Sequence, residues 1–434
     1  MPSIRDLPTH RITKFTNCRI PSGSELVEQD IWVDSVSGKI LRDQEAFYEY
    51  QLSPDQVEDL GGRILAPGFI DVQINGAQGF DFSVPQASKE EYDDGLKQVN
   101  RGLARMGITS YLPTVTSQRS DVYHKVLPSL GPSGVHRRAE DGAESLGAHV
   151  EGPFLSPGKN GIHTPEVLIS ADHGMEDLIN CYGSENLIPD ETSTNPKPAV
   201  KMITLAPEVG IMLSLIPTIQ SHGIICSIGH SDATYEEALS AVSAGAHMIT
   251  HLFNAMRPFY HRNPGIFGLL GQSEQPRPFY GLIADGIHLH PTCIQIAYNA
   301  HPQGLILVTD AMKLLGMPDG VYDWTNGERI EKSGPLLTLE GSERIAGSSA
   351  TLIECVNNFR RWAGARTAET IAAVTEKPAK MLGVYGAKGC LAPGADADLV
   401  VLGESVDEET GQANLTVDQV WKFGVKIVDK GKFC

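Results

Sequence analysis

Four side chains that could bind a metal ion or move a proton each stand at the end of a short apolar run. Glu151 ends the segment AHVE, His230 ends CSIGH, His251 follows HMIT, and Asp310 ends LILVTD. One carboxylate and two imidazoles form a suitable catalytic zinc shell, with a fourth position left for water. A metal ion lowers the pKa of that water to about 7, and a further carboxylate can accept its proton and return it to a leaving group. The pattern predicts a metal-dependent hydrolase in which Glu151, His230 and His251 bind one divalent ion and Asp310 is the acid–base group.

Each of these residues also has an ordinary structural interpretation. His230 could cap a helix, and Asp310 could be the N-cap of the helix that follows it. Four such residues at the ends of four separate runs favour a common site over four unrelated roles. His247 lies four residues before His251; in a strand it would share the same face about two pleats lower, so we assign it to the core.

Eight short apolar runs alternate with segments of helical periodicity, and this alternation predicts the order of elements. The runs are Phe69–Ile74, Ser110–Thr114, Gly147–Val150, Met202–Leu205, Ile224–Ile228, His247–Thr250, Tyr280–Ile283 and Leu305–Val308. Continuous apolar strands separated by helices indicate a parallel sheet that is covered on both faces. Eight repeats within about 250 residues favour an α/β fold of the closed (β/α)8 TIM barrel type over an open doubly wound sheet, since no GxGxxG motif follows the first strand. In a barrel the carboxyl ends of all strands open on one rim, so the four residues would converge there.

The segments on either side of the barrel are predicted to be β structure. Short strands are expected near the N-terminus and again in KGCLAPGADADLVVL and VWKFGVKIV near the C-terminus. Two flanks this short can bury a core only together. We therefore predict a small β-sandwich domain of residues 1–65 and 388–434, with a catalytic barrel of residues 66–387 between them.

Three segments outside these strands also carry a prediction. After the eighth run, Ala350–Ala363 and Ala368–Leu382 have the periodicity of helices. Residues 184–200 are polar and rich in proline, so we predict a surface loop without chemistry.

The composition excludes several classes of protein. Hydrophobic residues make up 41% of the 434 residues, enough for a large core without disulfides. The seven cysteines are scattered and form no CxxC pair, which is typical of reduced thiols in the cytoplasm. The net charge of −18 argues against nucleic acid or an anionic membrane as a partner. With no apolar run of about 18 residues and no signal-peptide h-region, we expect a soluble cytoplasmic protein.

The segments around the four residues resemble the amidohydrolase superfamily, and more closely its N-acetylglucosamine-6-phosphate deacetylase branch. PGFID and PGADADLVVL mark the superfamily, whereas EGPF, THLFNAM and AGSSATL are specific to the deacetylase branch. Many amidohydrolases carry HxH at the end of the first strand, but this chain has Gln73 and Asn75 there. Amide side chains are poor ligands for a second transition-metal ion. The resemblance therefore implies one divalent ion per subunit, with Zn²⁺ favoured although Fe²⁺, Co²⁺ or Mn²⁺ would also suit the ligands.

The resemblance also implies an activity, the hydrolysis of N-acetyl-D-glucosamine 6-phosphate to D-glucosamine 6-phosphate and acetate. His163 would polarise or orient the N-acetyl carbonyl, and Asp310 would carry the proton from water to the amine. The residues that would hold the sugar and phosphate are Gln73, Ile162, Asn254, Ala255, Arg262, His288, Ala350, Thr351 and Leu352. Arg262 matches a position that reaches into the neighbouring subunit, which implies a homodimer. Arg and His suit a phosphate dianion because their hydrogen bonds to it are charge-assisted.

Two other functions stay open at this point. A dihydroorotase- or deaminase-like amidohydrolase, acting on a cyclic amide or a nucleobase, generally uses the HxH pair that this chain lacks. A non-catalytic barrel kept for assembly would have lost a metal ligand or the acid–base group, and this chain has all four residues.

Overall fold

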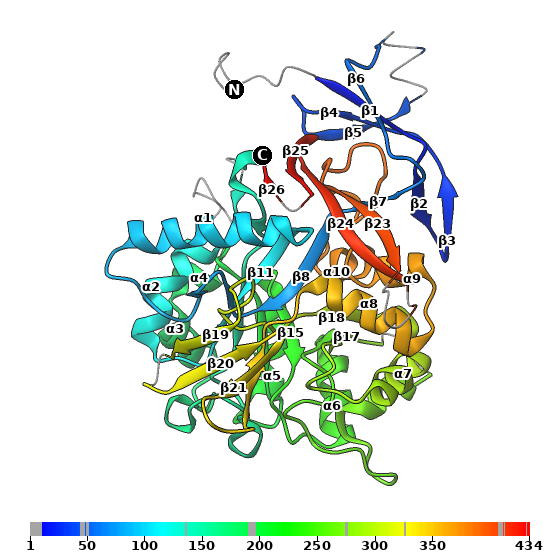
Figure 1. The fold of residues 1–434 in the computed structure, drawn as a ribbon. Coiled ribbons are helices and arrows are strands. Elements are labelled where there is room, and N and C mark those ends of the chain that lie inside the picture. Colours follow the sequence, from blue (N-terminus) through cyan, green and yellow to red (C-terminus); the bar gives the residue numbers. More distant parts are fainter. Residues whose placement is uncertain are drawn as a thin grey trace.

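A barrel of parallel strands forms the centre of the molecule (Figure 1). The structure is a computed structural model, and it describes residues 11–43, 48, 52–134, 137–189, 197–273, 277–324, 327–406, 411, 413–430 and 432–434. The barrel strands are β8 (Phe69–Ile74), β11 (Ile108–Thr116), β13 (Ala148–Glu151), β14 (Val200–Leu205), β15 (Ile225–Ile228), β16 (Met248–Ile249), β17 (Phe279–Ile283) and β18 (Leu305–Val308). Each overlaps one of the eight apolar runs, so the predicted barrel is confirmed.

Hydrogen bonds pair each barrel strand with the next in chain order, from β8 to β18. The barrel closes just beyond the ends of β18 and β8. There the N–H of Asp310 donates to the carbonyl oxygen of Gln73, and the N–H of Asn75 donates to that of Ala311, both at 2.9 Å. This closure brings the predicted acid–base group beside the residues that end the first strand.

Helices surround the barrel, and they are α1 (Lys89–Arg105), α2 (Ser120–Leu130), α3 (Met175–Tyr182), α4 (Ser184–Leu187), α5 (Met212–Ser221), α6 (Tyr235–Ala244), α7 (Pro291–Ala300), α8 (Leu352–Ala363), α9 (Thr367–Ala372) and α10 (Glu376–Met381). Helices α1, α6, α7 and α8 begin at a residue whose side chain accepts a hydrogen bond from a backbone N–H of the first turn. At α6 and α8, a threonine N-cap and a glutamate three residues later satisfy each other's backbone N–H groups. Helix α8 ends at Gly364, whose φ of +65° is the left-handed conformation that glycine adopts without strain. Among the described residues, no helix combines the length and apolar composition needed to cross a bilayer.

Two predicted segments differ from the structure or lie partly outside the described residues. The single helix predicted at Ala368–Leu382 is the pair α9 and α10. Pro378 has no backbone N–H and would interrupt one continuous helix. The first turn of a helix tolerates proline, so a second helix begins at Glu376. The predicted loop 184–200 begins with α4, and residues 190–196 lie outside the described residues.

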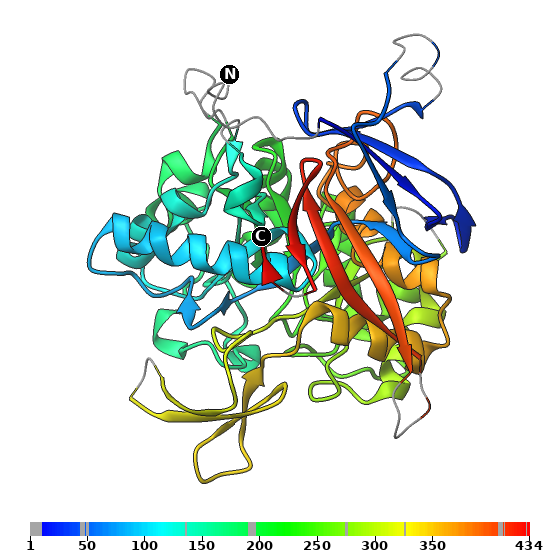
Figure 2. The same cartoon turned by 45° about the horizontal axis from the view of Figure 1, so that its top comes forward.

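The two chain termini form a β sandwich, seen in Figure 2 as blue strands beside red ones. Its strands are β1 (Ile12–Thr16), β2 (Arg19–Ser22), β3 (Glu25–Glu28), β4 (Ile31–Asp34), β5 (Lys39–Leu41), β6 (Gln56–Asp59), β7 (Ile64–Pro67), β23 (Leu399–Val406), β24 (Ala413–Lys422), β25 (Val425–Asp429) and β26 (Lys432–Phe433). One sheet has the order β5-β4-β1-β6, and the other, β26-β25-β24-β23-β7-β2-β3, joins both termini. Phe15 and Trp421 meet edge-on in the shared core, with ring centroids 4.9 Å apart. The sandwich is confirmed, while the division of the chain at residues 65 and 388 stays a prediction.

The segment VWKFGVKIV, predicted as one strand, is a hairpin. Strand β24 ends at Lys422 and β25 begins at Val425. The two residues between them, Phe423 and Gly424, have φ angles of +49° and +76°. Positive φ at both positions of a two-residue loop is typical of the type I′ turn, whose twist matches that of the paired strands.

A buried cluster of charges connects the sandwich to the barrel. It consists of Glu144, Asp396 and Asp398 with Lys39, Arg137, Lys388 and Lys422. Lys422 is only 1% exposed, and its Nζ lies 2.6 Å from Glu144 Oε1 and 2.8 Å from Asp398 Oδ2. Each carboxylate has at least two cationic partners, which buried charges need to offset their desolvation. We therefore interpret this cluster of three carboxylates as a salt-bridge network and not as a metal site.

Between β18 and α8 the chain forms a small antiparallel sheet that the sequence analysis did not predict. Its strands are β19 (Gly320–Asp323), β20 (Arg329–Ser333), β21 (Leu336–Leu339) and β22 (Ile345–Ser348), paired in chain order. Alternating burial along β20 is typical of a strand with one solvent face. Met312, Leu314, Ile330 and Leu337 form its separate core. Figure 2 shows this yellow sheet projecting from the barrel. Two further strands, β9 (Gly76–Ala77) and β10 (Phe80–Asp81), pair after β8, and β12 (Glu144–Ser145) pairs with β11.

Candidate active site

The three predicted metal ligands converge at the carboxyl ends of β13, β15 and β16. Oε1 of Glu151 lies 3.3 Å from Nε2 of His230 and 3.0 Å from Nε2 of His251, and the two nitrogens are 2.9 Å apart. Ligand atoms about 2.0–2.1 Å from a tetrahedral zinc ion are about 3.3–3.4 Å from one another. The three donor atoms therefore stand near the spacing that one shared ion requires.

The chemistry of these atoms also suits a cation. Nδ1 of His230 lies 2.8 Å from the carbonyl oxygen of Lys159, so Nδ1 carries the proton and the Nε2 lone pair faces the site. Burial by itself raises the pKa of Glu151, but hydrogen bonds and charges from His230 and His251 outweigh burial and hold the pKa well below its usual value. An ionised carboxylate and an imidazole lone pair that face each other in a buried site are stabilised by a divalent ion between them.

The backbone at these positions is strained. The φ angles of His230, His251 and Asp310 are +48°, +26° and +48°, in the region that residues with a side chain rarely adopt. Each such residue costs about 1–3 kcal/mol and persists where its surroundings fix it, as they often do at functional sites. The strain thus coincides with three of the four residues that the sequence predicted to be functional.

Asp310 lies buried beside Asn75. The Nδ2 of Asn75 donates a 2.8 Å hydrogen bond to Oδ1 of Asp310. Burial and the nearby charge of Glu151 raise the pKa of Asp310 to about 6. A carboxyl group with a pKa near neutrality can both accept and return a proton. From the sequence, Asn75 is expected only to be a poor metal ligand, and no sequence signal pairs it with a residue 235 positions away.

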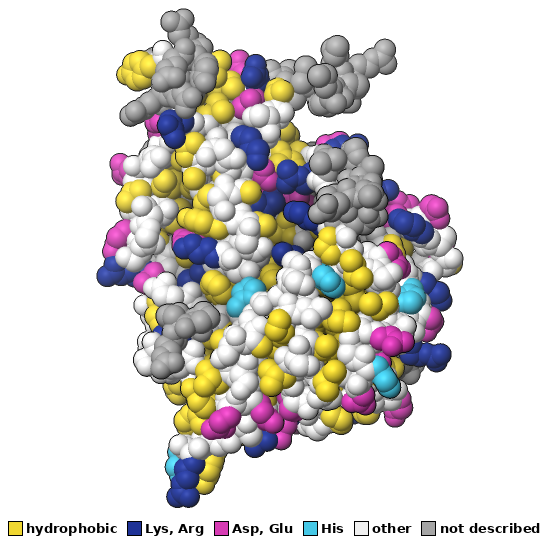
Figure 3. Space-filling view, turned by 180° about the vertical axis from the view of Figure 1, so that it is seen from behind, with side chains coloured by type: hydrophobic (Ala, Val, Ile, Leu, Met, Phe, Trp, Pro, Cys, Tyr) yellow, Lys and Arg dark blue, Asp and Glu magenta, His cyan; other side chains and the backbone are white. Residues whose placement is uncertain are grey.

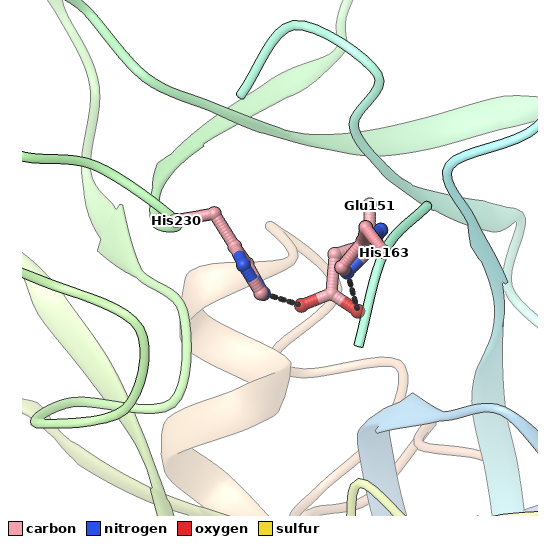
Figure 4. Close-up of side chains that lie close together, drawn as sticks. All are labelled: Glu151, His163 and His230. Atoms are coloured by element: carbon pink, nitrogen blue, oxygen red, sulfur yellow. Dashed lines mark ion pairs between the residues drawn. The ribbon is translucent and has the colours of Figure 1, made fainter. Parts of the chain in front are cut away.

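His163 enters the site on the loop that follows β13. The N–H of Ser117 donates to its Nδ1 at 3.1 Å, so the proton of the neutral ring is on Nε2. That Nε2 lies 3.9 Å from Oε2 of Glu151, and Figure 4 shows the rings of His163 and His230 each approaching one oxygen of this carboxylate. The two rings meet edge to face, with centroids 4.5 Å apart. Burial and the proximity of His230 lower the pKa of His163 to about 3, so the ring is neutral. His163 therefore presents an N–H donor to the reaction site.

Gln73 contacts Glu151, one of the predicted metal ligands. Its Nε2 donates to Oε1 of Glu151 at 3.1 Å, and its side chain is buried. This contact orients the carboxylate from outside, as partners of metal ligands commonly do. The substrate contact predicted for Gln73 stays a prediction.

Three of the predicted substrate residues lie near His251 on the rim. Asn254 donates from Nδ2 to the carbonyl oxygen of His251 at 3.3 Å, and Ala255 has a φ of +47°. His288 is held by Asp285, whose Oδ2 lies 2.7 Å from its Nδ1. Burial would lower the pKa of His288, but the Asp285 hydrogen bond and charge raise it above its usual value. A half-buried His288 that tends to carry a positive charge suits an anionic ligand.

The other predicted substrate residues differ in their surroundings. Ala350, Thr351 and Leu352 lie at the N-terminus of α8, the end of a helix that favours anions. Thr351 already donates its N–H to Glu354, within the capping box. Ile162 is 64% exposed. Arg262 is exposed and forms no hydrogen bond or ion pair with another described residue. It belongs to the loop of residues 255–264, and the green loop at the bottom of Figure 1 is this segment.

Comparison with known proteins places the chain in a family. Residues 64–428 match the amidohydrolase family. The human N-acetylglucosamine-6-phosphate deacetylase is 42% identical over 400 residues, which cover 91% of this chain and 93% of the relative. The deacetylase of Vibrio furnissii is 31% identical over 383 residues, covering 88% and 87%. This chain belongs to the N-acetylglucosamine-6-phosphate deacetylases of the amidohydrolase family.

Solved structures of the deacetylase family share the whole fold. The Pasteurella multocida enzyme has a TM-score of 0.75 at 26% identity, covering 96% of this chain and 99% of that one. A Mycobacterium smegmatis deacetylase variant in complex with N-acetyl-D-glucosamine 6-phosphate has a TM-score of 0.74 at 27% identity, covering 97% and 100%. A D-hydantoinase, at 14% identity and a TM-score of 0.58, shares the fold alone. The deacetylases are therefore favoured over the cyclic-amide hydrolases as the guide to function.

Proposed function

We propose that this protein hydrolyses N-acetyl-D-glucosamine 6-phosphate to D-glucosamine 6-phosphate and acetate with the help of one divalent metal ion, Zn²⁺ being favoured. The observation that carries the proposal is the convergence of Glu151, His230 and His251 within 3.3 Å of one another in a chain of the deacetylase family. A deaminase- or dihydroorotase-like activity has no comparable support.

Glu151, His230 and His251 would hold the ion, and when bound it would acidify a water molecule and polarise the acyl carbonyl. A single ion is favoured because the Gln73 amide is already engaged with Glu151 and Asn75 with Asp310. Neither amide is then placed to complete a second metal shell.

The protein's own residues account for the proton movements. The N–H of His163 at Nε2 donates to the acyl carbonyl oxygen and stabilises the negative charge that develops there. Asp310 accepts a proton from the attacking water as its oxygen bonds to the acyl carbon. Asp310 then donates that proton to the amine nitrogen as the C–N bond breaks, so acetate and the free amine leave.

Substrate recognition is proposed to use the residues around His251. Asn254, Ala255 and the N-terminus of α8 would contact the sugar and phosphate, with Ile162 at the edge of the site. The raised pKa of His288 suits it to a phosphate dianion.

We further propose a homodimer in which Arg262 of one subunit reaches the phosphate in the other. Phe259 and Tyr260, just before Arg262, are 59% and 53% exposed. Figure 3 shows apolar, histidine and basic side chains together at the projecting tip. Exposed aromatic residues beside an arginine are typical of the centre of a protein interface. All seven cysteines are free thiols, in keeping with the cytoplasm as the proposed location.

Metal removal and replacement test the function directly. The protein is treated with a chelator, and acetate release from N-acetyl-D-glucosamine 6-phosphate is measured before and after adding Zn²⁺, Co²⁺, Mn²⁺ or Fe²⁺. We expect the metal-free protein to be inactive and one ion per subunit to restore turnover. Dihydroorotate, as a cyclic amide, is the comparison substrate. Failure to release acetate with every ion, or faster opening of the cyclic amide, would refute the proposal.

A further inference from the structure

The strand order divides the rim of the barrel into two halves. In the half formed by β16, β17 and β18, the loops after β16 and β17 carry Asn254, Ala255 and His288, where the proposed function places the sugar and phosphate. The opposite half, at β8, β11 and β13, borders a cavity of about 880 Å³. Apart from Ile162, His163 and the residues that hold His163 and Asp310 (Ser117 and Asn75), the residues of this cavity have no role in the proposed reaction so far.

Two side chains connect the cavity to the reacting groups. His163 lines it and also faces Glu151 at 3.9 Å. Asn75 lines it and also donates to Asp310 at 2.8 Å. The Oδ1 of Asn75 is buried and has no hydrogen-bond partner among the described residues. The inner end of the cavity is therefore lined by polar groups, and it adjoins the position proposed for the scissile amide.

The outer wall of the cavity comes from the added sheet and its turns, and combines apolar side chains with the charged Glu328 and Arg344. Ile330 of β20, Leu339 of β21 and Ala346 of β22 line it. This sheet lies outside the repeating barrel pattern and has its own small core, so it forms a separate wall over this half of the rim.

The direction of the amide decides which part of a substrate enters the cavity. In the proposed reaction its carbonyl oxygen would face His163, and its nitrogen, which bears the sugar, would face Asp310 and the β16–β18 half. The remaining substituent of the acyl carbon then points to the opposite half. An acetyl group has a single methyl there, whereas a cavity of this volume is typical of a site for a whole small molecule, about 300–1,000 Å³.

We propose that this cavity is an acyl subsite and that the protein deacylates amino-sugar 6-phosphates whose N-acyl chains are longer than acetyl, of about four to six carbons. The proposal rests on the proposed function, because it assumes the same scissile amide. The polar inner end would hold the amide, and the apolar side chains of the added sheet would take the end of the chain.

Chain length is the variable to test, with the zinc-loaded, full-length protein. Glucosamine 6-phosphate carrying an N-acetyl, N-butanoyl or N-hexanoyl group is supplied, and release of the free amine gives kcat/KM for each. We expect the N-butanoyl compound to be hydrolysed within about tenfold of the N-acetyl compound, since a subsite that accepts the longer chain avoids the loss of about 10–200-fold that one misfitted methylene causes. A value for N-butanoyl more than about tenfold below that for N-acetyl would overturn the acyl subsite and leave the proposed function intact. Absence of turnover with all three would overturn both.

Larger side chains introduced at the cavity wall test whether the loss of activity depends on the length of the acyl chain. In Ala346→Trp, and in the milder Ala346→Leu, we expect the N-butanoyl and N-hexanoyl compounds to lose about 10-fold or more in kcat/KM while N-acetyl keeps its value. Val321→Trp is the matched control, because Val321 is an exposed residue of the same sheet that does not line the cavity. Equal losses on all three substrates in the Ala346 variants, or the same selective loss in the control, would overturn the proposal.

Discussion

Replacing Asp310 by asparagine tests the assignment of the acid–base group with little change in shape. The new side chain can still accept the hydrogen bond that Asn75 donates to Oδ1 at 2.8 Å. It cannot accept a proton at neutral pH. The substitution therefore removes proton transfer while keeping the volume and the main contact of the residue.

The expected loss follows from the size of general acid–base catalysis. A positioned acid or base contributes about 10²–10⁴-fold, so kcat should fall by that factor, which raises the barrier by about 3–5 kcal/mol. Metal content should stay at one ion per subunit, since Asp310 is not among the three converging ligands. The pKa of Asp310, raised to about 6, places its ionised form above that pH. In the wild type, kcat/KM should therefore fall as the pH drops below about 6, and the variant should lack this decline.

The assay is acetate release per metal-loaded subunit at several pH values. Asp71→Asn is a matched control, because Asp71 is a buried carboxyl group on neighbouring β8 that accepts a 2.6 Å hydrogen bond from Thr309. The control should lose stability but keep its turnover per folded molecule. Near-wild-type kcat in Asp310→Asn would show that Asp310 has only a structural role, and equal losses in both variants would refute a specific proton transfer.

Three further perturbations have distinct expected results. Arg262→Ala should raise KM for N-acetylglucosamine 6-phosphate by about tenfold or more, because a charge-assisted hydrogen bond contributes about that much. KM for unphosphorylated N-acetylglucosamine should not change, and equal effects on both sugars would contradict a phosphate contact. His163→Leu should lower kcat by about 10²–10³-fold with metal content unchanged, and unchanged kcat would remove the residue from the reaction. Cationic partners Lys422 and Lys388 outweigh burial and lower the pKa of Glu144 from 4.5 to about 2. Its ionised form therefore stabilises the fold above about pH 4.5, and this stability is lost as the pH falls toward 2. Urea unfolding over that range should show a weaker pH dependence in Glu144→Gln, and an identical dependence would contradict the role of this carboxylate.

The order of the elements, and which candidate metal ligands would converge, could be predicted from the sequence. Each barrel strand is a continuous apolar run because both its faces are buried, and that signal is local. Glu151, His230, His251 and Asp310 stand directly after such runs. Once a parallel barrel is expected, its geometry brings strand ends to one rim without further information.

Local patterns were less informative where one residue changes the course of the chain. Pro378 starts a new helix inside a segment with continuous helical periodicity. Phe423 and Gly424 form a turn inside a continuous apolar segment. The sheet β19–β22 has short amphipathic strands, whose signal is weak beside those of the barrel. In these cases backbone dihedral angles decide the structure, and periodicity does not record them.

The contacts that make the site chemically specific came only from the tertiary structure. Asn75 holds Asp310, Gln73 holds Glu151, and the carbonyl of Lys159 fixes the tautomer of His230. The cavity beside His163 is lined both by loops of the barrel and by the added sheet, which are far apart in the sequence. The sequence by itself determined which residues could do chemistry and on which elements they lie, since both follow from local apolar patterns. The partners of those residues are 71 to 235 positions away, so they are set by closure of the barrel, which a local pattern does not encode.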